Sequence, residues 1–135
     1  MYGKVIVVGN LGRDPEGRYT PGGTFVSNFN VAQNRRFTDQ SGNKQEKVLW
    51  FRVAAWGKTG EACQKFLKKG RQVLVEGELI GDENGNPRIW TGQDGSPRAS
   101  FELSARTVRF LGSRPADDGE PELIGAAGDD EEIPF

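Results

Sequence analysis

Two tryptophans and an arginine share one face of the segment Trp50-Phe-Arg-Val-Ala-Ala-Trp56 when that segment is read as a β-strand. Side chains alternate between the two faces of a strand, so Trp50, Arg52 and Trp56 point to the same side together with Ala54. Indole rings that flank a guanidinium can stack on unpaired bases and contact the adjoining phosphates, at about 1–3 kcal/mol per stacked base. The alternative is that both tryptophans are partly buried in the core, as tryptophans usually are.

Two further places in the chain combine arginine with an aromatic ring. Arg35 and Arg36 precede Phe37 at the end of a second candidate strand, and Arg88 precedes Trp90 in a polar loop. A large ring beside arginine in a polar loop has no obvious place in a core, although it can also anchor the loop or hold the arginine through a cation–π contact. Taken with the first segment, these places predict a groove for single-stranded nucleic acid.

The charged residues divide the chain into a basic body and an acidic tail. Residues 1–114 contain all 18 Lys and Arg and 11 Asp and Glu, for a net charge of +7. Residues 115–135 contain 8 acids and no base, for a net charge of −8. This asymmetry predicts a body that meets a polyanion. The alternative is an ordinary domain with a solubilising tail.

The body is predicted to consist of short strands around one helix. Turn clusters at residues 10–15, 21–23, 39–43, 82–85 and 93–97 separate apolar or alternating runs at 3–9, 24–37, 48–57, 71–80 and 99–111. Between the third and fourth runs, Thr59 is expected to cap a short helix whose last turn contains Lys68 and Lys69 and which ends at Gly70. The predicted fold class is therefore all-β with one short helix, as a five-stranded Greek-key barrel, the OB-fold, with extended hairpin loops.

The chain after residue 111 changes in composition. Residues 112–128 are mainly Gly, Ala, Pro and acids, too poor in apolar side chains to offset the entropy of ordering, so we expect a disordered linker. The last seven residues, 129–135, place two apolar residues around a proline behind four acids, which is unusual for a solubilising tail. The sequence thus predicts a domain at 1–111, a flexible linker and an acidic tip.

Catalytic and metal chemistry have little support in the composition. The chain has no His, the commonest general base and metal ligand, and only one Cys, Cys63, which excludes a disulfide within the chain. The acids of the tip have the composition of a Mg²⁺ site, but a flexible tail cannot hold metal ions at fixed separations. No apolar run approaches the roughly 20 residues that cross a bilayer. We expect no enzyme, no metal or other cofactor and no membrane segment.

Four stretches of the sequence resemble the bacterial single-stranded DNA-binding protein family. They are Gly9-Asn-Leu-Gly-Arg-Asp-Pro15, the Trp50–Lys58 segment, Leu67-Lys-Lys-Gly70 with Val73-Leu-Val-Glu-Gly77, and the terminal Asp-Asp-Glu-Glu-Ile-Pro-Phe. The similarity covers residues 1–111 almost continuously and the last seven residues, whereas the linker shows none.

The resemblance implies a homotetramer of OB-folds that wraps single-stranded DNA, in the cytoplasm and associated with the nucleoid. By motif, the stacking rings are Phe37, Trp50, Trp56 and Trp90. A tryptophan is commoner in the family at the position of Phe37 and a phenylalanine at that of Trp56, and either exchange keeps a flat ring. We choose the phosphate contacts by their proximity to these rings, namely Arg35, Arg36, Arg52, Lys58 and Arg88. Lys65, Lys68, Lys69 and Arg71 are either further contacts or solvated.

The resemblance also implies that the acidic tip recruits proteins of DNA replication, recombination and repair. The tip residues are Asp129, Asp130, Glu131, Glu132, Ile133, Pro134 and Phe135. The rival interpretations are a metal-dependent enzyme, an RNA-binding or primosome-associated OB module, and a protein adaptor in which the tryptophans are buried. Turnover of single strands would indicate the enzyme, and the relative affinity for oligo-dT and oligo-rU would identify the RNA-binding or primosome-associated module. Burial of the indoles would indicate the adaptor.

Overall fold

The computed structural model describes residues 1–112 of the 135-residue chain. Apart from Gly112, the predicted linker at 112–128 and tip at 129–135 lie outside the described residues. In chain order, the elements are β1 (Val5–Leu11), β2 (Glu16–Tyr19), β3 (Phe25–Thr38), β4 (Lys44–Trp56), α1 (Gly57–Phe66), β5 (Gln72–Leu79), β6 (Ile89–Thr91), β7 (Pro97–Ala99) and β8 (Phe101–Leu111).

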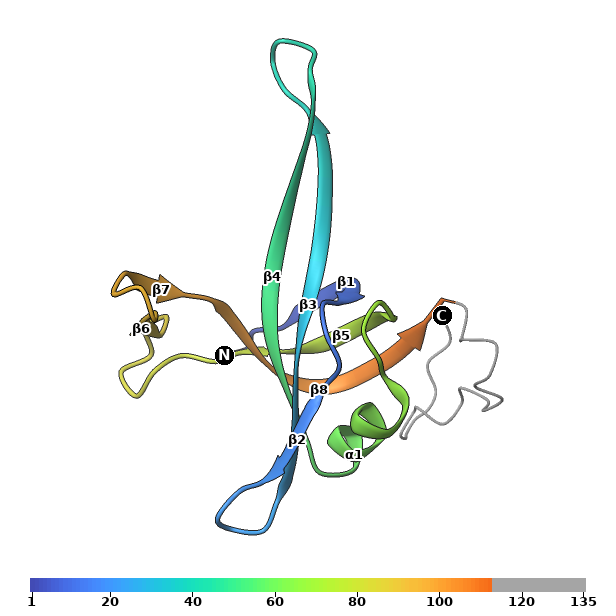
Figure 1. Ribbon diagram of the computed structural model, residues 1–135, viewed down its shortest axis with the longest axis vertical. Helices are drawn as coiled ribbons and strands as arrows, with labels where there is room; N and C mark the ends of the chain where they lie inside the picture. The colour runs from blue at the N-terminus through green and yellow to red at the C-terminus, as the bar shows by residue number, and fades with distance from the viewer. Residues whose placement is uncertain (113–135) are drawn as a thin grey trace.

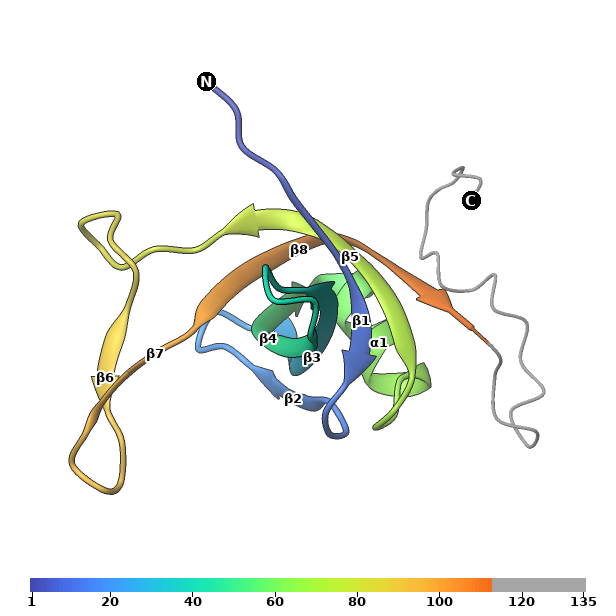
Figure 2. The same cartoon turned by 90° about the horizontal axis from the view of Figure 1, so that it is seen from above.

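Five of the strands close into a barrel, which Figure 2 shows from above. The strand order is β1-β5-β8-β4-β3-β2, and β1 pairs in addition with β3, where Leu11 lies opposite Val31. The second pairing joins the ends of the sheet and leaves β2 as an extra strand on β3. Every pairing in the barrel is antiparallel except that of β4 with β8. The fold is the five-stranded OB-fold barrel that the sequence predicts.

The core fills the barrel with side chains from alternate positions of each strand. On β4, for example, Phe51, Val53 and Ala55 are buried and their neighbours are not. The helix α1 adds Cys63, and Leu67 follows at its C-cap. The remaining core residues are Val7 and Leu11 of β1, Phe29 and Val31 of β3, Val73 and Val75 of β5, and Leu103 and Val108 of β8.

Three hairpins extend from the barrel, and the longest joins β3 to β4 (Figure 1). Four tight turns share one design, in which a glycine with φ between 83° and 89° donates its amide to the carbonyl three residues earlier; these glycines are Gly23, Gly42, Gly85 and Gly95. Only glycine adopts this backbone without strain. At the β3–β4 turn, Asp39 also accepts the amide of Asn43, the main cause of a lowered pKa of its carboxyl, and that of Ser41. The sequence placed all four turns correctly.

Three local predictions differ from the structure. Residues 16–19, which the sequence analysis assigns to no strand, form β2, whereas the polar hairpin expected at 82–97 is present with β6 and β7 as its strands. The helix begins at Gly57, and its N-cap Trp56 makes no side-chain capping bond, so the Thr59 cap is wrong. The helix also ends at Phe66, so Lys68, Lys69 and Gly70 lie beyond it.

The helix starts early because it packs closely on the end of β4. A methyl group at Gly60 would meet the carbonyl oxygen of Ala55 at 2.3 Å, so only glycine allows this approach. Gln64 then links the helix to two other segments, since it accepts from the hydroxyl of Ser27 and donates to the carbonyl of Pro15. Within residues 1–112, no helix has the length and apolar character needed to cross a membrane.

Candidate nucleic-acid interface

Strand β4 presents both tryptophans on the outer face of the barrel. Trp50 is 49% exposed and Trp56 is 41% exposed, and Arg52 between them is exposed as well. The opposite face of the strand supplies Phe51 and Val53 to the core. The alternative in which these indoles fill the core is therefore wrong for Trp50 and Trp56.

The neighbouring strand β3 contributes small and polar side chains to the same face. Asn30 lies opposite Arg52, and Ala32 lies opposite Trp50. Asn28, opposite Ala54, continues the row, and all three residues are half-buried. Because these side chains are short, they leave the indole rings uncovered, and a flat ring can stack on the indoles.

The ring of Trp50 lies against the backbone of Gly12 in the loop between β1 and β2. A methyl group at Gly12 would lie 2.6 Å from Cζ3 and 2.8 Å from Cη2 of the indole. The Gly12 amide donates to the carbonyl of Asn30 over 3.0 Å, which holds this loop against β3. The absence of a side chain at Gly12 thus allows the observed pose of Trp50.

The third tryptophan joins the same face from the β6–β7 hairpin. Trp90 of β6 is half-buried, and the guanidinium carbon of Arg52 lies 5.4 Å from the centre of its ring. Arg88, two residues earlier, donates from Nη2 to Oε2 of Glu102 over 2.6 Å, which raises the pKa of Arg88. Nη1 of Arg52 is 3.8 Å from the same carboxylate oxygen. Trp90 is therefore held by the cation–π contact that the sequence left open as an alternative to stacking, with its ring still partly exposed.

The remaining candidates on β3 lie out on the long hairpin. Phe37 is 46% exposed and pairs with Gln45, five residues before Trp50 and so roughly 17 Å from it along the strand. Strand alternation places Arg35 and Phe37 on one face of the hairpin and Arg36 on the other. Arg36 is 3.8 Å from Glu46 in an exposed ion pair, a kind of pair that contributes little to stability.

The basic residues around the helix have different surroundings. Lys58 is exposed in the first turn of α1, two residues after Trp56, and Lys65, Lys68 and Lys69 are exposed as well. Arg71 is buried, with its Nε donating to the carbonyl of Leu111 and its guanidinium over the ring of Phe110. Both interpretations that the sequence left for Arg71, contact residue or solvated residue, are therefore wrong.

A match to the family model described as "Single-strand binding protein family" spans residues 2–111, which is nearly all of the described chain. The chain belongs to this family. A single-stranded DNA-binding protein of Wolinella succinogenes is 39% identical over 88% of this chain and 70% of its own length. Single-stranded DNA-binding protein 2 of Chlorobaculum tepidum is 43% identical over 93% of this chain and 81% of its own length.

Solved structures of the family have the same fold. The SSB of Plasmodium falciparum in complex with ssDNA superposes with a TM-score of 0.68 at 25% identity, over 83% of this chain and 97% of that one. A deletion mutant of the single-stranded DNA binding protein from Thermus aquaticus gives 0.65 at 32% identity, over 82% of this chain and 51% of that one.

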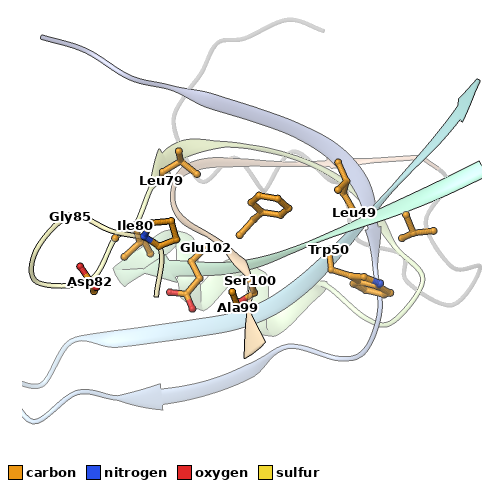
Figure 3. A pocket seen from close by; sticks show the side chains of 13 residues that line it. Leu49, Trp50, Leu79, Ile80, Asp82, Gly85, Ala99, Ser100 and Glu102 are labelled. Atoms are coloured by element: carbon orange, nitrogen blue, oxygen red, sulfur yellow. The ribbon is translucent and has the colours of Figure 1, made fainter. Parts of the chain in front are cut away.

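In this member of the family, an apolar pocket of about 770 Å³ opens beside the tryptophan face. Figure 3 shows Leu79 and Ile80 on one side of it, Trp50 on the other, and Glu102 between them. Pro87 and Phe101 also line it. These walls suit an apolar or ring-shaped group better than a phosphate, because the charged side chains that line the pocket, Asp82 and Glu102, are acidic.

Three features of this face depend on tertiary contacts that the spacing of residues does not reveal. They are the position of Gly12 under Trp50, the asparagines beside Arg52, and Glu102 beneath two arginines. Glu102 reaches Arg52 because β8 runs parallel to β4 with these two residues in register. Such a long-range register cannot be read from residue spacing, although the alternation of Glu102 with the apolar residues around it marks an outward-facing position.

Proposed function

We propose that this protein binds single-stranded DNA without regard to base sequence. Bases stack on Trp50, Trp56, Trp90 and, along the hairpin, Phe37, while phosphates meet the basic side chains Arg35, Arg36, Arg52, Lys58 and Arg88. The observation that carries the proposal is the pair of exposed indoles flanking Arg52 on β4. Membership of the single-strand binding protein family supports it.

The chemistry of this face determines what it selects. Every base offers a flat face, so stacking accepts any sequence, and phosphate contacts carry no sequence information. A duplex is a poor ligand because its bases are already stacked on each other. We expect affinity to fall with salt, with a log–log slope near −0.7 for each neutralised phosphate of a single strand.

A titration of tryptophan fluorescence tests the proposal. Oligo-dT should quench the emission strongly, whereas a duplex of equal length should quench it little, because only unpaired bases stack on the indoles. Oligo-rU in parallel separates a DNA-binding protein from an RNA-binding module. Absence of quenching by any single strand would refute the proposal.

We further propose that the protein works as a homotetramer. Ile6 and Val8 on the outer face of β1 are 57% and 42% exposed, and half-buried Leu74 of β5 lies opposite Val8. A second copy that covers this apolar row would remove it from water. Sedimentation equilibrium should give four chains, and Ile6→Lys with Val8→Lys should lower that number. A wild-type monomer at micromolar concentration would contradict the assembly.

The tip is proposed to recruit proteins of DNA replication, recombination and repair, from residues 129–135 on a linker at 112–128. The four acids steer a basic partner, and Ile133 and Phe135 fill an apolar pocket on it. Deleting residues 133–135 should abolish capture of such partners and leave oligo-dT affinity within about twofold. A truncated protein that still captures them would refute the role of the tip.

The proposed role is binding rather than catalysis, in the bacterial cytoplasm and at the nucleoid. The relatives that match are named for binding single-stranded DNA. Incubation of labelled oligo-dT with the protein and Mg²⁺ should leave the strand intact, and cleavage that scales with protein concentration would overturn this part of the proposal.

A further inference from the structure

Glu102 is a buried acid within a face that is otherwise suited to an anion. The residue is 9% exposed, whereas the side chains of Arg52 and Arg88 above it are each 51% exposed. Oε2 of Glu102 accepts from Arg88 over 2.6 Å and lies 3.8 Å from Nη1 of Arg52. A single carboxylate oxygen is therefore shared by two of the five cations assigned to phosphate.

The same contacts join two separate sheets. Arg52 and Glu102 belong to the barrel strands β4 and β8, whereas Arg88 and Trp90 lie on the chain that leads into and forms β6. β6 pairs only with β7 among the described strands, and Figure 2 shows this hairpin standing away from the barrel. With Arg52 over the ring of Trp90, the four side chains form a link from the hairpin to the tryptophan face.

We propose that the Glu102 carboxylate competes with DNA phosphate for Arg52 and Arg88. Carboxylate and phosphate oxygens are the two anionic acceptors that guanidinium groups bind best, with similar geometry. In the free protein, Glu102 accepts a hydrogen bond from Arg88 and lies at ion-pair distance from Arg52, so a bound strand has to share both guanidinium groups with it or displace it. This inference rests on the proposed function and assigns to Glu102 the role of setting the affinity and its dependence on salt.

The charge count of the link gives the direction of the effect. Two guanidinium groups and one carboxylate leave one net positive charge for the strand, whereas two remain when the carboxylate is neutral. Glu102→Gln keeps the shape of the side chain and an oxygen that can accept from Arg88. Both arginines are half-exposed, so water can solvate them when the negative charge is gone, and the variant buries no unpaired ion.

The experiment compares the binding of wild type and E102Q to an oligo-dT short enough to occupy one chain, across a range of salt concentrations. E102Q should bind about three- to tenfold more tightly at low salt. Its log–log salt slope should be steeper by about 0.7, the contribution of one more neutralised phosphate charge. Simple loss of structure would weaken binding, so the combination of tighter binding and a steeper slope is specific to competition.

Glu78→Gln is the matched control, because it removes the same charge from another arginine pair. Glu78 lies 2.8 Å from Arg106, and both side chains are more than half exposed. Neither belongs to the tryptophan face contacts described above. E78Q should change the affinity less than twofold, since solvent screens an exposed charge at a distance.

The affinities of E102Q and E78Q decide whether Glu102 competes with phosphate. Affinity of E102Q equal to or weaker than that of wild type overturns the competition, as does an equal gain in E78Q. If E102Q does not fold, Glu102→Asp, which keeps the charge but shortens the side chain by one methylene, should still show a smaller gain, and a loss of affinity overturns the inference. Failure of the wild type itself to bind oligo-dT would instead refute the proposed function.

Discussion

The pose of Trp50 depends on a glycine two strands away, and this dependence can be measured. In Gly12→Ala, the new methyl group would lie 2.6 Å from Cζ3 of the indole, whereas carbon atoms in contact are about 3.5–4.0 Å apart. The ring must therefore move by about 1 Å. Because Trp50 is half-exposed, the ring can swing outward, and we expect the free energy of unfolding to change by less than about 1 kcal/mol.

The displaced ring should bind DNA less well. A stacked base contributes about 1–3 kcal/mol, and a misplaced ring retains part of that, so we expect a loss of about 1 kcal/mol, or about fivefold in Kd for oligo-dT. Gly3→Ala is the control, because a methyl group there meets nothing within 4 Å. Its Kd should equal that of wild type.

A double-mutant cycle with Trp50→Phe isolates the contact. The phenyl ring keeps a flat face but lacks the outer indole atoms Cζ3 and Cη2 that approach Gly12. G12A should therefore have no effect in the W50F background, where quenching of Trp56 and Trp90 still reports binding. Wild-type affinity in G12A, or an equal loss in both backgrounds, would refute the reasoning.

Three further predictions concern the thiol, the core and the salt dependence. Burial raises the pKa of Cys63 to about 12, whereas the unfolded thiol ionises near 8.5, so stability should fall as pH rises above about 8.5, by about 2 kcal/mol from pH 8 to 10. Urea unfolding should show this excess slope in wild type and not in Cys63→Ala, and equal slopes would contradict it. Leu103→Ala, at a fully buried position, should cost about 2–5 kcal/mol in urea unfolding, and a cost below 1 kcal/mol would contradict the assigned core. Arg36→Gln should lower the salt slope of oligo-dT binding by about 0.7, whereas an unchanged slope would remove Arg36 from the phosphate contacts.

The barrel strands could be predicted because each has a clear inside and outside. Alternation identified the buried face of β4, and turn residues such as Gly42 and Gly85 marked the hairpins. β2 was missed because all four of its residues are exposed, so it shows no alternation of buried and exposed positions, and its ring contact with β3, between Tyr19 and Phe25, cannot be read from the spacing of residues. The helix start was misplaced for a similar reason, since it depends on the close approach of Gly60 to β4.

The rings of the candidate site were recognisable from the sequence, but their supports were not. Gly12 lies under Trp50 and Arg52 lies over Trp90, in both cases across a tertiary contact whose register the spacing of residues does not reveal. Immobilising a side chain on binding costs about 0.5–1.5 kcal/mol, which is comparable with the lower part of the 1–3 kcal/mol that a stacked base supplies. A ring that is held before the strand arrives avoids much of that cost. The contribution of each tryptophan to DNA affinity should therefore depend on the contacts that hold its ring as much as on the exposed area of the ring. Only a structure supplies those contacts.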